Sequence, residues 1–216
     1  CKQNENCPPW SIKATKIQHD QNTKQLIYDN AILRLYDFPV LYTPKFYHPD
    51  PTVRRLSGFL RPQFNSSDEL GNSIHVPYFH VISDTKDITI RPTIFDSDIK
   101  MFQNEYRQQN ESSEFIADFS LTTGYQPSYS KEKKSISHLF AKFTSDLKFE
   151  NFDVSDLYVQ FEKVSNDTYL KVFDTNLLEN NLKPANSNSL KSQVALKLNN
   201  DSFDLATGMR AYEKLS

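Results

Sequence analysis

Residues 10–64 read WSIKATKIQHDQNTKQLIYDNAILRLYDFPVLYTPKFYHPDPTVRRLSGFLRPQF, and this stretch decides the fold. Before His48, apolar and polar residues alternate, which predicts β-strands because successive side chains of a strand point to opposite faces. Such strands fit a sandwich or jelly roll, in which one face packs inward and the other is wetter. We expect strands over Trp10–Ile17, Gln25–Tyr36 and Phe38–Phe46.

The alternation stops at His48-Pro49-Asp50-Pro51. Each proline removes a backbone donor and disfavours helix in the residue before it, so regular strand pairing should end there. The sequence therefore predicts three parts: residues 1–48 as the end of one β-domain, residues 49–58 as a hinge, and residues 59–216 as a second β-domain.

The second domain contains about ten further alternating segments with no helix expected between them. In one of them, Phe119 and Leu121 share a face while Asp118 and Ser120 populate the other. Such a series is typical of a transmembrane β-barrel, although a large soluble β-sandwich shows the same alternation. The expected strands are Phe59–Phe64, Ile74–Ile82, Lys86–Phe95, Ile99–Gln108, Ser113–Tyr125, Ser137–Phe149, Val154–Val164, Thr168–Asp174, Leu190–Asn199 and Phe203–Glu213.

Composition narrows the class of protein. No apolar run approaches the roughly 18 residues of a spanning helix, and the net charge of −2 over 216 residues argues against nucleic acid as a partner. The chain opens on Cys1 without a signal-peptide pattern and ends directly after an expected strand. Because an incomplete sheet leaves an unpaired edge, we expect the chain to be a piece of a larger barrel.

Cys1 and Cys7 both precede Trp10. In an oxidising compartment they could pair with each other or with distant cysteines, and in the cytosol they could be metal ligands. Two cysteines without a well-spaced histidine are too few for a zinc site, which favours disulfide chemistry. We expect no metal site and no cofactor.

No catalytic constellation is found. His48 and Asp50 could serve acid/base or metal chemistry, but a rigid hinge explains them without it. His75 and His80 have an odd offset, which places them on opposite faces of a strand. Ser57-Gly58 lacks the glycine pattern of a nucleophile elbow. The protein is therefore expected not to be an enzyme.

Pro62 and Pro77 lie in the first two strands expected after the hinge, one in each. Each removes a donor from the hydrogen-bond ladder. Because backbone pairing in the first hairpin is weakened in both strands, we expect the sheet to open there. The alternative is that both prolines simply sit at strand ends or bulges.

The sequence resembles the LPS-assembly protein LptD family, with the HPDP run closest to its α-proteobacterial branch. The resemblance covers most of the chain and is densest from Trp10 to Pro92. The residues that carry it are Trp10–Ala14, His19-Asp20, Tyr28, Asn30-Ala31, Pro39-Val40, Tyr42, Pro44, the run HPDPTVRRLSGFL ending at Leu60, Pro62, Pro77-Tyr78, and Ser165–Asp174.

The resemblance implies an all-β fold: the end of a periplasmic β-jelly roll, followed by the first antiparallel strands of a large outer-membrane β-barrel in a Gram-negative bacterium. It implies transport of lipopolysaccharide (LPS) through the jelly-roll interior and sideways through a seam between the first and last barrel strands. The implied partners are LPS, a plug lipoprotein, LptE, and a periplasmic bridge protein, LptA. Family members bond a cysteine shortly before the matching tryptophan to one near the barrel's end, and either Cys1 or Cys7 could fill that role.

The resemblance also assigns site residues. Pro62 and Pro77 match the prolines that weaken the family's lateral gate. Acyl chains need an apolar trough, since burial stabilises by about 0.8 kcal/mol per CH₂. A soluble carbohydrate-binding jelly-roll module and a generic porin remain the alternatives. Candidates for the trough lining, each of which could instead be ordinary jelly-roll core, are Ile12, Ala14, Ile27, Ala31, Leu33, Val40 and Tyr42.

Overall fold

The computed structural model describes residues 10–22, 24–35, 38–50, 55–127 and 132–215. The chain divides into two compact units, Cys1–Leu56 and Ser57–Ser216. The division falls within the predicted hinge, residues 49–58. The identification of the first unit as a jelly roll and of the second as part of a barrel stays a prediction.

The N-terminal unit is a small antiparallel sheet with β3 (Gln25–Leu35) at its centre. Strands β1 (Trp10–Lys13) and β2 (Lys16–Asp20) lie along one edge of β3 in a single register, and β4 (Phe38–Pro49) pairs with the other edge. The predicted first strand is interrupted between β1 and β2, opposite Asn30, whose φ is 51°.

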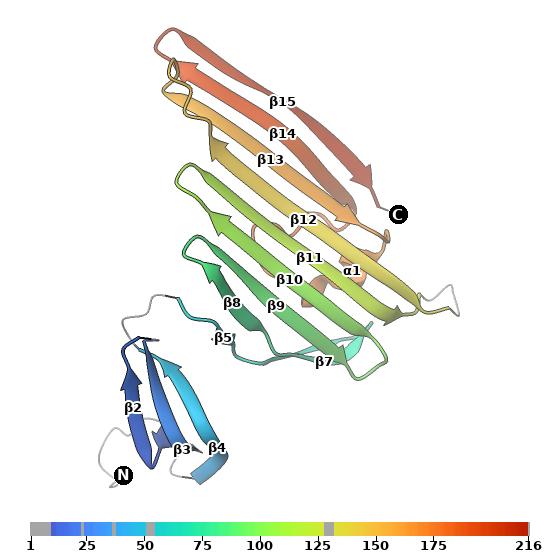
Figure 1. The fold of residues 1–216 in the computed structure, drawn as a ribbon. Coiled ribbons are helices and arrows are strands. Elements are labelled where there is room, and N and C mark those ends of the chain that lie inside the picture. Colours follow the sequence, from blue (N-terminus) through green and yellow to red (C-terminus); the bar gives the residue numbers. More distant parts are fainter. Residues whose placement is uncertain (1–9, 23, 36–37, 51–54, 128–131, 216) are drawn as a thin grey trace, which may run out of the picture. The chain divides into compact units, whose positions relative to one another are not determined.

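The C-terminal unit is one open antiparallel sheet, which confirms the all-β fold class (Figure 1). The sheet order runs from β15 down to β9 and then to β7 and β6, while β8 pairs with β9 and β5. The strands are β5 (Gly58–Phe59), β6 (Gln63–Ser67), β7 (Gly71–His75), β8 (Tyr78–Ser83), β9 (Lys86–Phe95), β10 (Lys100–Gln109), β11 (Ser113–Tyr125), β12 (Lys134–Asp146), β13 (Val154–Val164), β14 (Ser189–Asn200) and β15 (Phe203–Lys214).

The prediction of a strand over Thr168–Asp174 was wrong. This segment forms the short helix α1 (Tyr169–Val172) and a 3₁₀ turn, η1 (Asp174–Asn176). The Asn166 side chain accepts hydrogen bonds from the Thr168 amide at 3.0 Å and its hydroxyl at 2.7 Å, which starts the turn. Helical spacing then brings Tyr169 and Phe173 onto one buried side, where they stack.

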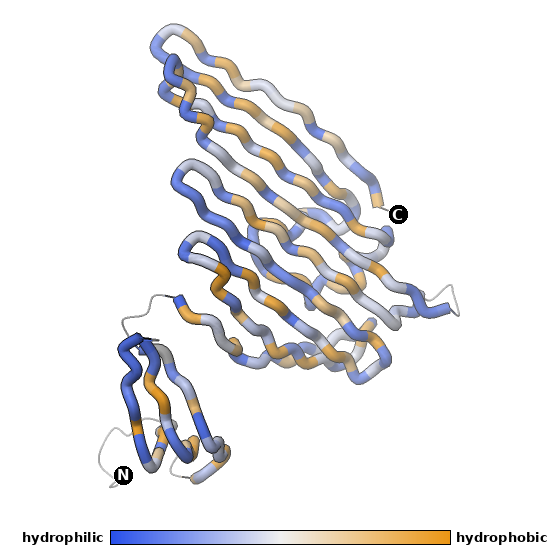
Figure 2. Tube along the Cα trace, viewed as in Figure 1, coloured by the Kyte–Doolittle hydropathy of each residue, from blue (hydrophilic) through white to orange (hydrophobic). Residues whose placement is uncertain are grey.

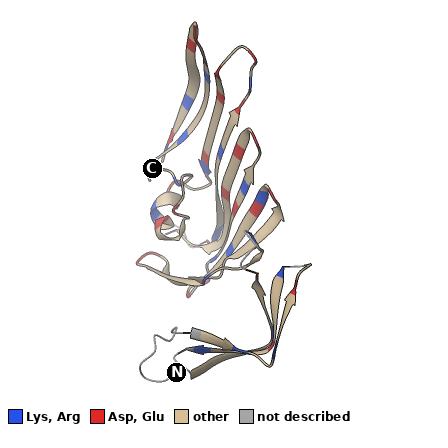
Figure 3. Ribbon diagram, turned by 90° about the vertical axis from the view of Figure 1, so that its left-hand side faces the viewer, with Lys and Arg blue, Asp and Glu red and all other residues tan. Residues whose placement is uncertain are grey.

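We call residues 165–188, between β13 and β14, the strap. The strap covers one face of the curved sheet, which we call the inner face (Figure 3). Apolar side chains of the strap and of the strands form a single core there. Its buried members are Leu70, Phe95, Ile99, Met101, Tyr125, Ile136, Phe140, Val164, Tyr169, Leu170, Phe173, Leu177, Leu182, Leu190 and Leu215.

The opposite, outer face of the large sheet carries exposed apolar side chains, and hydropathy alternates along its strands (Figure 2). Cross-strand pairs such as Ile74↔Ile94 and Phe119↔Leu139 place these side chains on one face. No helix within the described ranges is long and apolar enough to span a lipid bilayer. Exposed apolar residues on this face include Ile74, Ile94, Phe102, Phe119, Leu121, Leu139, Phe161, Val194 and Met209.

Candidate functional site

The first hairpin, β5 to β8, is interrupted at one level in both of its strands. Pro62 lies between β5 and β6, and Pro77 lies between β7 and β8. Pairing stops at Phe59↔Tyr78 on one side of the break and resumes at Gln63↔His75 on the other. Within the break, the Leu60 amide donates to the Pro77 carbonyl at 2.8 Å. The hairpin thus consists of two short paired blocks in place of one continuous ladder.

Strand β9 runs past this break and contributes a third proline at the same level. It pairs with β7 up to His75↔Thr93 and with β8 from Tyr78↔Ile90, which leaves Arg91 and Pro92 opposite the interruption. Sequence analysis missed Pro92 as part of the feature, although a proline inside an expected strand was the available signal. Backbone pairing is therefore weakened across three neighbouring strands.

Side chains on the inner face bridge these three strands where the ladder is missing. We call Gln63, His75 and Arg91 the clasp. The Nε2 atom of His75 lies 2.9 Å from Gln63 Oε1 and 2.9 Å from Arg91 Nη2. His75 is only 1% exposed and Arg91 only 7%. Nε2 donates to Gln63 in one tautomer of His75 and accepts from the buried Arg91 guanidinium in the other, so His75 links β7 to β6 or to β9.

A second buried polar network joins the strap to the middle of the sheet. The Tyr169 hydroxyl lies 2.6 Å from Ser120 Oγ and 2.8 Å from His138 Nδ1. The other ring nitrogen of His138 lies 3.1 Å from Asp118 Oδ1, and Gln103 Nε2 donates to both carboxylate oxygens of Asp118 at 3.0 Å. Burial raises the pKa of the Tyr169 phenol. Tyr169 thus anchors the strap as a neutral hydrogen-bonding group.

Three further contacts fix the strap. Asn65 of β6 donates to the Thr175 carbonyl at 2.8 Å, and Asn176 donates to Ser73 Oγ of β7 at 3.2 Å. Asn180 donates to Glu105 of β10 at 2.7 Å.

Lys183 ties the strap to itself. Its Nζ lies 2.6 Å from Glu179 Oε1 and 2.9 Å from Asp174 Oδ1. Partial burial alone would lower the pKa of Lys183, but the hydrogen bonds and charges of the two carboxylates outweigh it and raise that pKa. The cation therefore holds the turn of the strap closed.

The N-terminal sheet brings four of the predicted trough residues together. Ile12 pairs with Leu33, and Leu33 pairs with Leu41, so these side chains share a face. Ala31, two residues from Leu33, lies on that face and is 2% exposed. Ala14 follows β1 at the level of Ala31 and is half-buried. We call this group the apolar patch: Ile12, Ala14, Ala31, Leu33 and Leu41.

The other three predicted residues lie apart from the patch. Ile27 is on the same face, but the charged row Lys16↔Asp29↔Lys45 separates it from the patch. Tyr42 pairs with Ile32 and donates to Asn30 Oδ1 at 2.8 Å, which places it on the opposite face. Val40 is the extra residue of a bulge between Leu33↔Leu41 and Arg34↔Pro39, and it is 51% exposed.

The remaining candidate residues are the two cysteines and those of the hinge. Cys1 and Cys7 lie outside the described residues, as do residues 51–54 of the hinge. Asp50 forms an ion pair with His19 Nε2, a partner that sequence analysis did not anticipate. Among the side chains that the structure describes, no group of three or more His, Cys, Asp or Glu could hold a metal ion.

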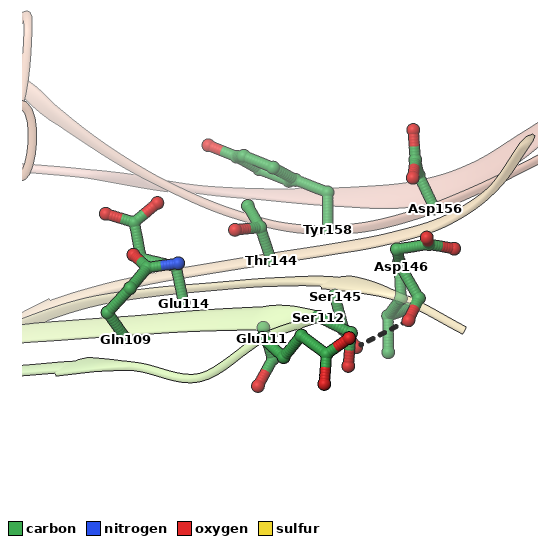
Figure 4. A pocket seen from close by; sticks show the side chains of 11 residues that line it. Gln109, Glu111, Ser112, Glu114, Thr144, Ser145, Asp146, Asp156 and Tyr158 are labelled. Atoms are coloured by element: carbon green, nitrogen blue, oxygen red, sulfur yellow. Dashed lines mark hydrogen bonds between the residues drawn. The ribbon is translucent and has the colours of Figure 1, made fainter. Parts of the chain in front are cut away.

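A polar pocket of about 470 Å³ lies by the β10–β11 and β12–β13 turns (Figure 4). Its floor is a cross-strand row on the inner face, Gln109↔Glu114↔Thr144↔Tyr158, and Asp156 adds a further carboxylate. The row lies on the same face as the buried network but beyond the strap's core. This end of the inner face is therefore polar.

No family model matches the chain, but curated proteins do. The LPS-assembly protein LptD of Pseudomonas aeruginosa (strain UCBPP-PA14) is 28% identical over 179 residues, which are 78% of this chain and 18% of that protein. The LptD of Pseudomonas entomophila (strain L48) is 26% identical over 210 residues, 94% of this chain and 21% of that protein. The LptD of Legionella pneumophila (strain Paris) is 30% identical over 186 residues, with coverages of 78% and 21%. The chain thus spans about a fifth of the length of these curated relatives.

Proposed function

We propose that this chain, whose sequence is LptD-like over most of its length, is part of a transporter that inserts LPS into the outer leaflet of a Gram-negative outer membrane. In this proposal the N-terminal unit is the end of a periplasmic jelly roll and the large sheet is the first part of a barrel. The proposed activity is transport, in which no covalent bond is made or broken.

The observation that carries the proposal is the interruption of the first hairpin. Pro62, Pro77 and Pro92 remove amide donors at one level of three neighbouring strands. A bulky lipid can leave a barrel sideways only if an edge of the sheet separates, and separation costs least where ladder bonds are already missing. We therefore assign the lateral gate to the first hairpin, with Pro62 and Pro77 as its weak points.

The apolar patch is the proposed path for acyl chains in the N-terminal unit. Its side chains come from three neighbouring strands, and Ile12, Leu33 and Leu41 keep accessible surface around the buried Ala31. The charged row Lys16↔Asp29↔Lys45 marks where that surface ends. Acyl chains laid along the patch gain about 0.8 kcal/mol for each CH₂ removed from water. The path therefore runs over Ile12, Leu33 and Leu41 in preference to Tyr42.

The finer parts of the proposal follow from the likeness to LptD. A periplasmic bridge protein, LptA, would deliver LPS to the N-terminal unit, and a plug lipoprotein, LptE, would occupy the barrel. Cys1 or Cys7 would form a disulfide with a cysteine near the far end of the barrel. Each of these is a partner or bond to be sought in the full-length protein.

The test is photo-crosslinking in cells, with a light-activated residue placed in the full-length protein at Leu33 or, separately, at Ile32. The two positions are adjacent and both apolar, but they point to opposite faces of β3. We expect LPS adducts at Leu33 and not at Ile32. Equal yields, or none at Leu33, would contradict the path, and a generic porin or a carbohydrate-binding jelly roll would then be the better account.

A further inference from the structure

We propose that the strap is an inner latch that holds the distal half of the first hairpin, β6 and β7, against the continuous strands of the sheet. Asn65 and Asn176 are its positioning residues. The contact between the strap and the hairpin is a feature of the fold. That this contact restrains the lateral gate rests on the proposed function.

The latch consists of two hydrogen bonds from η1 to the two strands of the hairpin. Asn65 Nδ2 of β6 donates to the Thr175 carbonyl at 2.8 Å, and Asn176 Nδ2 donates to Ser73 Oγ of β7 at 3.2 Å. Asn176 is 3% exposed and Ser73 is 6% exposed. Neither of these two polar groups can turn to water if the contact opens only slightly, so the Asn176–Ser73 bond resists separation more than the exposed Asn65–Thr175 bond does.

The other end of the latch is fixed to strands that the prolines do not interrupt. Tyr169 bonds to Ser120 of β11 and His138 of β12, and Asn180 bonds to Glu105 of β10. Phe173 is fully buried in the same core. The strap therefore connects the hairpin to β10, β11 and β12 by a route that does not pass along the backbone ladder.

The latch contacts the strand at the end of the sheet, β6, which has few backbone pairs. Strand β6 lies at the end of the sheet order and pairs with β7 over five residue pairs, Gln63↔His75 to Ser67↔Gly71. The strap and the β6–β7 turn lie at the same end of the strands. Strands β6 and β13 run in the same direction in the antiparallel order, and each connection follows one of them. If the hairpin is to move, the bonds of Asn65 and Asn176 must break first.

Amide hydrogen exchange of the full-length protein in lipid tests the latch, with Asn176→Ala and Asn65→Ala as the opening variants. We expect residues 63–67 and 71–75 to exchange about tenfold faster in Asn176→Ala and a few-fold faster in Asn65→Ala, while residues 113–125 keep their rates. Asn65→Gln, which retains an amide donor, should return exchange toward the wild-type rate.

The matched control is Asn200→Ala, which removes an asparagine-to-carbonyl hydrogen bond of β14, to Asn151 at 2.9 Å, and leaves every bond of the strap in place. It should not change exchange in β6 or β7. Unchanged exchange in both opening variants, or an equal rise in Asn200→Ala, would overturn the latch. If β6 and β7 loosen as expected but crosslinking at Leu33 finds no LPS, the transport function fails and the latch stands.

Discussion

The first hairpin and the hairpin β11–β12 belong to the same sheet but are held together differently. Strands β11 and β12 pair without interruption from Ser113↔Ser145 to Thr122↔Ile136. The first hairpin has only two short blocks of pairs, separated at Pro62 and Pro77. Where the ladder is broken, the clasp and the strap supply side-chain contacts. The comparison teaches that these side chains set the stability of the first hairpin, whereas the backbone sets that of β11–β12.

The largest effect is expected from removing the strap's main apolar contact with Phe173→Ala. Phe173 is fully buried, with its ring 5.0 Å from that of Tyr169 and 5.6 Å from that of Tyr125. Truncating such a side chain costs about 3–5 kcal/mol. Unfolding in detergent should show this loss, and exchange should rise in both hairpins. Phe203→Ala, at a half-exposed ring of β15, is the control and should change little.

The clasp gives the next effect, confined to the first hairpin. His75→Leu leaves Gln63 and the buried Arg91 guanidinium without their shared partner, a loss of about 1–3 kcal/mol. Exchange should rise in residues 63–67 and 71–75 but not in β11 or β12. His80→Leu, at an exposed histidine of the same hairpin, serves as the control. An equal rise in the two variants would show that the clasp has no special role.

Restoring the ladder should make the first hairpin resemble β11–β12. Pro62→Val together with Pro77→Val returns two amide donors, each worth about 1 kcal/mol when paired. We expect slower exchange in residues 58–83 and reduced delivery of LPS to the cell surface. Pro44→Val, in the N-terminal unit, should leave exchange in the hairpin unchanged. Normal delivery with a tightened hairpin would place the exit for LPS elsewhere.

The smallest effect is expected at the exposed pair Asp98–Lys133, whose atoms lie 2.5 Å apart with 82% and 53% of the side chains exposed. The hydrogen bond and charge of Lys133 lower the pKa of Asp98. Lys133→Ala should let that pKa rise toward its usual value without a measurable change in unfolding, because exposed pairs contribute little. A clear loss of stability would mean that contacts between loops also stabilise the sheet, in addition to the contacts within the two hairpins.

Alternation with a period of two was enough to predict the all-β fold, because it is set by the strand backbone alone. It could not predict the strap. Thr168–Asp174 has strand-like composition, and the turn started by Asn166 together with the packing of Tyr169 and Phe173 against the inner face makes it helical. Two apolar residues on otherwise polar strand faces, Phe140 and Ile116, were the available signal that something covers this face. Both contact the core under the strap.

The predicted site residues were placed by register, which sequence alone does not give. One extra residue at Val40 shifts the pairing of β4, so Tyr42 faces away from Leu33. The charged row that divides Ile27 from the apolar patch combines three strands and is invisible in any one of them. Pro62 and Pro77 were easier to find, since proline removes an amide donor in any context.

The most direct test of the central claim compares amide exchange in the two hairpins of the wild-type, full-length protein in lipid. If the broken ladder makes the first hairpin the part of the sheet that opens, residues 58–67 and 71–83 should exchange at least about a hundredfold faster than residues 113–125 and 134–146. Equal protection of the two hairpins would contradict the account.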